Sequence, residues 1–250
     1  MRIHLLFKKE ELDEAKLDAT KTVVVFDVLL ATSTISACLS FGARAVIPVA
    51  DEEEAREIAG SLPTEEYCMA GEWNGLPIDG FSYPLPLALQ EKVAGKTLIL
   101  RTTNGTVAIR KAVAARKVWI ASILNSPAVA RKVYEEYEDE TILLTCAGSA
   151  NQFCLEDFYG AGYFLSELVQ LAGGGAVQLT DSALGAKLFY DSQKDQNEML
   201  LAQTQVGRAM LEMGVSEDLH FVSQKEKLEV APYLSGHEIV CDRSVSLYNS

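Results

Sequence analysis

The chain has 250 residues, of which 48% are hydrophobic, and a formal net charge of −13 at pH 7. This composition is sufficient for a large buried core, although length alone leaves open whether the core forms one domain or two packed lobes. The acidic balance excludes general nucleic-acid binding, because the sequence has no Lys/Arg stripe to displace phosphate counterions. A bound anion must therefore meet local donors, single cations or a metal ion.

The sequence predicts a cytoplasmic protein without a membrane segment. Its first residues enter a short strand directly, with no signal-peptide pattern, and no apolar run reaches the roughly 18 residues of a membrane-spanning helix. The cysteines are odd in number and lack Cys-x-x-Cys spacing, which indicates reduced thiols. They are Cys38, Cys68, Cys146, Cys154 and Cys241.

The first half of the chain alternates between strand-like and helix-like segments. In order, we expect a strand at Arg2–Phe7, a charged connection at Lys8–Thr20, a strand at Thr22–Val28, a helix at Ser33–Phe41, a strand at Ala45–Val49, a helix from Asp51 to about Ala59 and a strand at Glu66–Ala70. A Gly- and Pro-rich loop follows at Trp73–Leu87, and we expect it to cover the ligand crevice.

The second half continues the same alternation and then becomes helical. We expect strands at Lys96–Arg101, Lys117–Ala121 and Thr141–Thr145, and helices at Gly105–Ala114, Ser126–Tyr137 and Leu155–Leu171. Two helices, split near Asp191–Asp195, are expected within Leu179–Met213, and a late strand at Glu238–Cys241.

This order predicts a three-layer α/β fold with a mostly parallel or mixed sheet. Residues 1–250 are expected to form a single catalytic unit. A unit of strand, hydroxyl-rich loop and helix recurs, so a division into two similar packed lobes is left open, with its boundary near 115–140.

Three apolar runs end in clusters of small hydroxyl, amide, glycine and acidic residues, at Val23–Thr34, Leu98–Thr106 and Ile142–Asp157. Each run is typical of a buried strand, and each cluster is typical of the turn into a helix. In open α/β sheets, the loops beyond the carboxyl ends of the strands form the ligand crevice. We therefore predict that these loops converge on one pocket for an anion and a hard cation.

Asp27 follows four apolar residues, and a carboxylate buried there is unfavourable unless a cation or a donor meets it. One interpretation is a cap for the next helix. The other is a metal ligand or catalytic acid, which we favour because perturbed acids gather in clefts. Thr32, Ser33 and Thr34 follow Asp27 and are predicted to contact the phosphate.

The loop Thr102–Thr106 (TTNGT) has the chemistry of a phosphate-binding loop, since hydroxyls and backbone amides donate and glycine permits close approach. An ordinary helix cap would need only one of these residues. The predicted phosphate ligands here are Arg101, Thr102, Thr103, Gly105 and Thr106, with Asn104 as a catalytic residue.

Gly148 and Ser149 offer a similar set of donors after the third apolar run. Glu156 and Asp157 follow in the first turn of a helix, where acids commonly interact only with the helix dipole. The alternative, that one of them binds Mg²⁺, is equally compatible with the sequence. The predicted Mg²⁺ ligands are Asp27, Glu72, Glu156 and Asp157, and Asp157 is also predicted to be catalytic.

Other centres are disfavoured. Cys146 lacks the following Arg of cysteine phosphatases, since Gln152 stands there, and a buried thiol is the better interpretation. The three histidines lack zinc-ligand spacing. The stretch Gly160–Gly162 lies inside a predicted helix and is typical of close helix packing rather than dinucleotide binding.

Taken in order, these motifs resemble those of the 2-phosphosulfolactate phosphatases of coenzyme M biosynthesis, over nearly the whole chain. The motifs are Asp27–Thr32, Gly71-Glu72, Thr102–Thr106, Gly148, Leu155–Asp157 and Ala161-Gly162. The resemblance implies a Mg²⁺-dependent α/β phosphatase that cleaves the phosphate ester of a small sulfonated hydroxy acid.

The chain departs from that family pattern in three places. Leu30 and Trp73 stand where the pattern usually has Arg, and the stretch after Gly80-Phe81 lacks its usual Asp and Asn. Each lost Arg–anion hydrogen bond is worth about 1.5–3 kcal/mol. Arg101, directly before the threonine loop, is a candidate to compensate.

Three functions are therefore carried forward. The first is a Mg²⁺-dependent phosphatase for 2-phosphosulfolactate or a related phosphorylated hydroxy acid, in which water or Asp27 attacks phosphorus. The second is a haloacid-dehalogenase-like phosphatase, disfavoured because Leu29 replaces the second Asp of that class. The third is a catalytically weakened relative that binds an anionic metabolite. A homodimer is also expected, as for many symmetric cytoplasmic enzymes.

Overall fold

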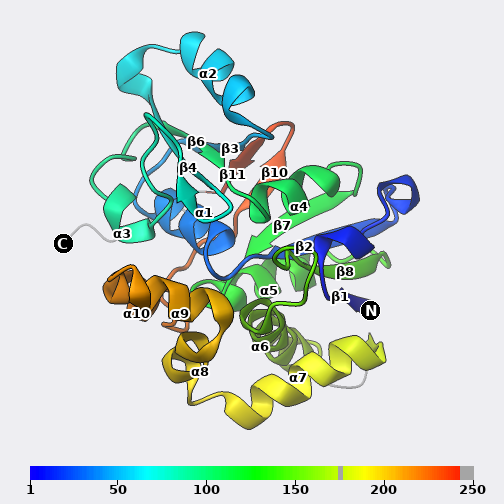
Figure 1. The fold of residues 1–250 in the computed structure, drawn as a ribbon. Helices are drawn as coiled ribbons and strands as arrows, with labels where there is room; N and C mark the ends of the chain where they lie inside the picture. The colour runs from blue at the N-terminus through cyan, green and yellow to red at the C-terminus, as the bar shows by residue number, and fades with distance from the viewer. Residues whose placement is uncertain (174–176, 243–250) are drawn as a thin grey trace, which may run out of the picture.

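The computed structural model describes residues 1–173 and 177–242 (Figure 1). The predicted α/β class is confirmed, because these residues form an eleven-stranded, mostly parallel sheet with helices on both faces. The strands are β1 (Arg2–Leu6), β2 (Lys21–Phe26), β3 (Ala45–Pro48), β4 (Tyr67–Trp73), β5 (Leu76–Pro77), β6 (Thr97–Arg101), β7 (Lys117–Ala121), β8 (Thr141–Cys146), β9 (Gln178–Leu179), β10 (Tyr233–Ser235) and β11 (Glu238–Val240).

The helices largely follow the predicted order. They are α1 (Ala31–Ser40), α2 (Glu52–Gly60), α3 (Pro86–Leu89), α4 (Gly105–Lys111), α5 (Ser126–Glu135), α6 (Leu155–Leu171), α7 (Asp181–Gln193), α8 (Asn197–Gln203), α9 (Gln205–Glu212) and α10 (Ser216–Val222). The charged connection after β1 contains two short 3₁₀ helices, Lys9–Glu11 and Glu14–Lys16.

The sheet order is β5-β4-β6-β3-β11-β10-β7-β2-β8-β1-β9. Strands β4, β6 and β3 run parallel to one another, and so do β7, β2, β8, β1 and β9. The antiparallel hairpin β10–β11 joins these two groups, since β11 pairs with β3 through Ile239 and Val46, and β10 pairs with β7 through Tyr233 and Trp119. The sheet is thus continuous, and the proposed division into lobes stays a prediction.

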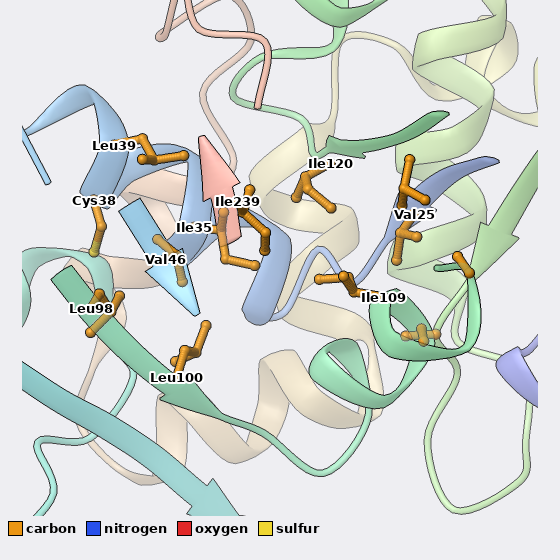
Figure 2. Close-up of a cluster of buried hydrophobic side chains, with 14 of the residues drawn as sticks. Val25, Ile35, Cys38, Leu39, Val46, Leu98, Leu100, Ile109, Ile120 and Ile239 are labelled. Carbon is orange, nitrogen blue, oxygen red and sulfur yellow. The ribbon is translucent and has the colours of Figure 1, made fainter. Parts of the chain in front are cut away.

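Strand β2 is covered on both faces, which explains its unbroken apolar sequence. Val23 and Val25 pack with α1 and α4, whereas Val24 and Phe26 pack with α5, α6 and α7. Figure 2 shows part of the first cluster, where Val25 of β2, Ile35 of α1 and Ile109 of α4 lie with strand residues from both halves of the sheet. The alternation of side chains along a strand therefore builds a core on each face of the sheet.

Helix α2 covers the face of β3 and β6 that lies opposite α1. Ile47 and Ile99 pack with α2, while their neighbours Val46 and Leu98 point to the α1 side. Asp51 begins the helix as predicted, because its carboxylate accepts the Glu54 N–H at 3.0 Å. Local capping chemistry was therefore sufficient to place this helix start.

The region predicted as two helices within Leu179–Met213 contains three, α7, α8 and α9, after the short strand β9. Thr204 separates α8 from α9, since its hydroxyl accepts the Gly207 N–H and donates to the Leu201 carbonyl. Helix α10 was not predicted. Both corrections concern helices of seven or eight residues, and α8 and α10 begin without a side-chain cap or a proline.

The predicted loop Trp73–Leu87 contains more regular structure than expected. Strand β4 extends to Trp73 and turns back as β5, with Glu72 opposite Pro77, and α3 begins at Pro86. Along the described part of the chain, no helix combines the length and hydropathy required to cross a bilayer.

Candidate active site

A cavity of about 580 Å³ lies where the three predicted polar loops meet. Its lining includes Asp27 from the connection after β2, Asn104 from the connection after β6, and Ser149 from the connection after β8. The structure therefore confirms that these loops converge on one pocket. Further lining residues come from the first 3₁₀ helix, from Glu72, Asn74 and Gly75, from residues 83–85, and from α9.

The convergence does not arise from neighbouring strand ends alone. Strand β6 is separated from β2 in the sheet order by β3, β11, β10 and β7. Even so, Gly105 at the start of α4 lies directly against Asp27, and a methyl group on residue 105 would be 2.5 Å from Asp27 Oδ2. The connection after β2 and the start of α4 after β6 are therefore in direct contact, although β2 and β6 are not neighbours in the sheet. Residue 105 has no room for a side chain.

Asp27 is 7% exposed and faces this cavity. Burial raises the pKa of its carboxyl to about 7, with the charges of Glu72 and Glu156 adding to the rise; the Ala31 N–H, which donates to Oδ1 at 3.3 Å, and the Lys9 charge oppose it. Near neutral pH the carboxyl group therefore occupies both protonation states, which is the condition for accepting or donating a proton in catalysis.

Asp157 is buried behind the cavity and does not line it. Its Oδ1 accepts the Val28 N–H at 2.8 Å, and its Oδ2 accepts the Gly148 N–H at 3.1 Å. Burial and the charges of Asp27 and Glu156 hold the pKa of Asp157 well above its usual range. The residue thus joins the loop after β2 to the loop after β8, which is a positioning role rather than the predicted direct contact.

Glu72 lines the cavity, but protein donors occupy its carboxylate. Oε1 accepts the Thr103 N–H at 2.6 Å, while Oε2 accepts the Thr103 hydroxyl at 2.8 Å and the Gly75 N–H at 2.7 Å. Glu72 therefore fixes the start of the threonine loop against the β4–β5 turn.

Arg101 does not reach the cavity, contrary to its predicted contact with phosphate. Its guanidinium donates to the Glu72 carbonyl at 2.9 Å and lies 3.9 Å from the centre of the Trp73 ring. Burial lowers the pKa of Arg101, with Glu72 opposing the shift. The side chain stabilises the end of β4, so it does not replace the anion contacts missing at Leu30 and Trp73.

Most of the predicted hydroxyl ligands are used inside the protein. Thr102 and Thr106 bond reciprocally, each hydroxyl accepting the other residue's N–H at 3.1 Å. The hydroxyls of Thr32, Ser33 and Thr34 donate to the carbonyls of Asp27, Val28 and Pro84, respectively. Buried hydroxyl groups need hydrogen-bond partners, and these five find them inside the protein. Of the five residues, only Thr102 borders the cavity.

Gly148 contributes backbone geometry rather than a lining surface. Its φ is +64°, and a side chain there would approach the Gln152 carbonyl at 2.6 Å, so the turn before Ser149 requires glycine. Ser149 itself lines the cavity and exchanges backbone hydrogen bonds with Gln152.

Lys9 is a site residue that the sequence did not single out. Its ammonium donates to Asn104 Oδ1 at 2.9 Å and to the Ala147 carbonyl at 3.3 Å, and pairs with Glu10 at 3.0 Å. Among the described residues that line the cavity, Lys9 is the only cation. It stood in a charged connection where no spacing distinguished it from a solvent-exposed lysine.

The four predicted Mg²⁺ ligands do not form a four-carboxylate centre. Asp27 and Glu72 line the cavity, whereas Asp157 is tied to backbone N–H groups and Glu156 is buried beside Thr204 and Cys154. In residues 1–173 and 177–242, no group of three or more His, Cys, Asp or Glu side chains is placed to hold a metal ion. Asp27 Oδ2 accepts no hydrogen bond from the described residues, and one carboxylate can suffice when substrate phosphate and water complete the shell.

The two other sequence predictions near the site are confirmed. Cys146 is fully buried, and burial raises the pKa of its thiol well above the usual value. Gly160 lies against Val28, where a methyl group would be 2.7 Å from Val28 Cγ2, as expected for close packing.

An α/β sheet that brings a buried acid, a lysine, an amide and hydroxyl groups to one cavity has the groups with which an enzyme can bind and hydrolyse a small anionic ester. Comparison with known proteins makes this specific. The family model described as 2-phosphosulpholactate phosphatase matches residues 6–237. The chain belongs to this family of phosphoric monoester hydrolases, as the motif resemblance implied.

Individual relatives agree with this family. A protein of Clostridium perfringens (strain SM101 / Type A) is 37% identical over 243 residues, covering 96% of each chain. A protein of Clostridium acetobutylicum is 33% identical over 96% of this chain and 100% of its own length. One of Symbiobacterium thermophilum is 35% identical over 89% of this chain and 94% of its own. Each of them is named "Probable 2-phosphosulfolactate phosphatase".

Proposed function

We propose that this protein hydrolyses the phosphate monoester of a small hydroxy acid and that Asp27 is its central catalytic group. The first substrate to test is 2-phosphosulfolactate, because the relatives carry its name. The observation that supports the proposal most directly is the meeting of Asp27 with the Lys9–Asn104 pair in one cavity. This arrangement places a titrating carboxyl beside a cation and an amide.

Lys9 and Asn104 are proposed to hold the phosphoryl group. The Lys9 ammonium supplies charge, and Asn104 Nδ2 is a donor that has no hydrogen bond to the described residues. Donors fixed in advance stabilise the charge that spreads over the phosphoryl oxygens in the transition state. Asp27 then acts as the base for an attacking water or as the nucleophile itself; both routes need its ionised carboxylate.

We also propose that Mg²⁺ assists, held by Asp27 together with substrate oxygens and water. A bound Mg²⁺ would neutralise phosphoryl charge. The proposed contacts of Lys9 and Asn104 with the phosphoryl group do not require the metal ion. The expected result is that hydrolysis is lost in excess chelator and returns when Mg²⁺ is added; hydrolysis that is indifferent to chelator would reject the metal.

The test of the catalytic proposal is Asp27→Asn. The amide keeps the size of the side chain and can still accept the Ala31 N–H, but it cannot ionise. We expect kcat for a hydrolysed ester to fall by about 100-fold or more. Asp181→Asn, an exposed position at the start of α7, removes the same charge and should leave kcat unchanged. Unaltered activity in folded Asp27→Asn protein would overturn the proposal.

The proposed role of Lys9 has a matched control in the adjacent residue. Lys8 bonds Asn151 at 2.9 Å and does not line the cavity, whereas Lys9 does. Lys9→Gln should lower kcat/KM for the phosphate ester by about tenfold or more, because charged hydrogen bonds are worth about 1.5–3 kcal/mol. Lys8→Gln should change it little. Equal effects of the two variants on kcat/KM in steady-state kinetics would contradict the proposed role of Lys9.

One observation favours a second function, that of a catalytically weakened anion binder. Three acids, Glu10, Asp27 and Glu72, line the cavity against the single cation Lys9 of the described lining residues. Under this alternative, inorganic phosphate would raise the thermal midpoint without any ester being turned over. If the protein hydrolyses an ester and Asp27→Asn abolishes that hydrolysis, the protein is an enzyme and the anion-binder alternative is rejected.

A further inference from the structure

A tight turn at Ser149–Gln152 contributes to the wall of the cavity. Ser149 and Gln152 exchange two backbone hydrogen bonds, of 3.0 and 2.8 Å, and the two residues between them have positive φ, +49° for Ala150 and +60° for Asn151. Two consecutive residues of this conformation define the type I′ turn of tight hairpins. Ser149, Ala150 and Asn151 all line the cavity, so the turn brings main-chain groups to its surface.

The positive φ is unusual for Ala150. Residues other than Gly, Asn and Asp rarely adopt this conformation, because Cβ then crowds the following carbonyl oxygen. Residues held in this way gather at binding and catalytic sites. A turn that keeps Ala150 in the left-handed region at the wall of a cavity is therefore a candidate part of the binding site.

Three donors of this turn have no acceptor among residues 1–173 and 177–242. Two are the backbone N–H groups of Ala150 and Asn151. The third is Asn151 Nδ2, since the Asn151 side chain is held through Oδ1, which accepts Lys8 Nζ at 2.9 Å. Successive N–H groups in turns form concave sites for anions. The turn thus offers neutral donors to an anion.

A second turn with positive φ also lines the cavity, but its donors are already used. The φ is +51° at Asn74 and +77° at Gly75. The first N–H donates to the Thr103 hydroxyl and the second to Glu72 Oε2, each at 2.7 Å. An anion at this second turn would also be repelled by the Glu72 carboxylate. The Ser149–Gln152 turn is therefore the better site for a second anionic group.

The Ser149–Gln152 turn follows directly on a contact of the proposed phosphate-binding pair. Lys9, which donates to Asn104, also donates to the Ala147 carbonyl at 3.3 Å, and one residue separates Ala147 from the turn. Lys9 is the only cation among the described residues that line the cavity. When Lys9 holds the phosphate, a second acidic group of the substrate must be met by neutral donors.

We propose that the Ser149–Gln152 turn is the subsite for the sulfonate of the substrate, held by the Ala150 and Asn151 N–H groups and by Asn151 Nδ2. The inference rests on the proposed phosphatase function and assigns residues to one part of its first test substrate. In 2-phosphosulfolactate the carboxylate is attached to the carbon that carries the phosphate. The sulfonate is one carbon further away, so it can reach a separate subsite, and it has three oxygens to accept from the three donors.

The test compares two esters that differ by this group, 2-phosphosulfolactate and 2-phospholactate. The full-length protein is assayed for kcat/KM on both, and the ratio of the two values reports the contribution of the sulfonate. We expect the sulfonated ester to be favoured by about tenfold or more, as hydrogen bonds to a charged group predict. Hydrolysis of both esters with equal kcat/KM would overturn the inference.

Asn151→Asp locates that preference in the turn. Aspartate tolerates positive φ and can still accept from Lys8, but it replaces the Nδ2 donor with a negative charge. The ratio of kcat/KM values should fall by about tenfold or more, while hydrolysis of 2-phospholactate is retained. Gln205→Glu is the matched control, because Gln205 lines the cavity from α9 and undergoes the same change of charge. Equal falls in the two variants would overturn the placement.

Binding of the reaction product separates this inference from the proposed function, because it requires no turnover. In calorimetric titrations we expect 3-sulfolactate to bind about tenfold or more tightly than lactate. That advantage should be lost in Asn151→Asp and kept in Gln205→Glu. Failure to hydrolyse either ester would reject the proposed function, and the titrations would still decide whether the turn holds a sulfonate. Equal binding of 3-sulfolactate and lactate to the wild-type protein would overturn the inference in either case.

Discussion

Gly105 is the residue at which the two regions of the candidate active site touch. A methyl group there would overlap Ala31 and approach Asp27 Oδ2 at 2.5 Å. The sequence identified this glycine as a point of close approach, but assigned the approach to phosphate; in the structure its nearest neighbours are Ala31 and Asp27.

We predict that Gly105→Ala lowers both stability and activity. Overpacking of this kind costs about 1–3 kcal/mol, and the displaced Asp27 should reduce kcat as well. Urea unfolding and steady-state kinetics measure the two effects. Gly60→Ala, where nothing lies within 4 Å of the added methyl group, should leave both unchanged or slightly improve stability. Equal behaviour of the two variants would contradict the contact.

The raised pKa of Asp27 predicts how stability depends on pH. Its ordinary value is 3.8 and its value in the folded protein is about 7. Between these values the folded state holds a proton that the unfolded state has released, so this group makes stability fall as pH rises from about 4 to 7, and the loss persists above 7.

Asp27→Asn removes that titration. The difference in unfolding free energy between variant and wild type should therefore shift in favour of the variant by about 2–4 kcal/mol between pH 4 and pH 8. Urea unfolding at both pH values gives the difference directly. A difference that is independent of pH would show that the carboxyl group is not perturbed.

At the scale of elements, α6 and α7 pack through glycine. Gly162 of α6 faces the backbone of α7, and a methyl group on it would overlap the Ala186 carbonyl. The first turn of the same helix contains Asp157, which ties the loops after β2 and β8 to each other. The position of α6 therefore affects the candidate active site as well as the core.

Gly162→Ala should separate α6 from α7 and cost about 2–3 kcal/mol. Gly185→Ala is the matched control on the facing helix, because its methyl group would meet only the Phe158 ring, at 3.9 Å. That variant should be neutral or stabilising by up to about 1 kcal/mol, since alanine favours helix. Thermal or denaturant unfolding would contradict the contact if both variants lost the same stability.

At the scale of the whole molecule, the β10–β11 hairpin joins the two groups of parallel strands into one sheet. Ile239 is fully buried, pairs with Val46 of β3, and lies in the cluster that Figure 2 shows together with Ile35 of α1. Tyr233 makes the corresponding link to Trp119 of β7, with ring centres 5.6 Å apart. Two short strands from the end of the chain thus join segments that precede them by more than a hundred residues.

We predict that Ile239→Ala destabilises the entire protein by about 2–5 kcal/mol in one cooperative transition. Hydrogen exchange should accelerate in β3 and β7 together, because both are joined through the hairpin. Leu188→Ala, at a 57% exposed position, should change stability by less than about 0.5 kcal/mol. Faster hydrogen exchange confined to β11 would contradict this prediction, because it would show that the hairpin unfolds independently of β3 and β7.

The sequence by itself determined the α/β class, most strands, the start of α2 and the membership of Asp27, Asn104 and Ser149 in one pocket. These features depend on local rules: apolar runs, capping residues and the polar turns that follow strands. Local rules were also sufficient to recognise Cys146 as a buried thiol.

Only the tertiary structure decided which polar groups remain available. Thr106 and Arg101 have the right chemistry for an anion, yet their hydrogen bonds are made to neighbouring protein atoms. Lys9 has no distinctive local sequence, yet folding brings it to Asn104, 95 residues away. The apolar residues that line the cavity, such as Leu30, Leu85 and Met210, likewise come from distant segments. Availability of a donor depends on every group within about 3 Å, and sequence neighbours supply only some of them.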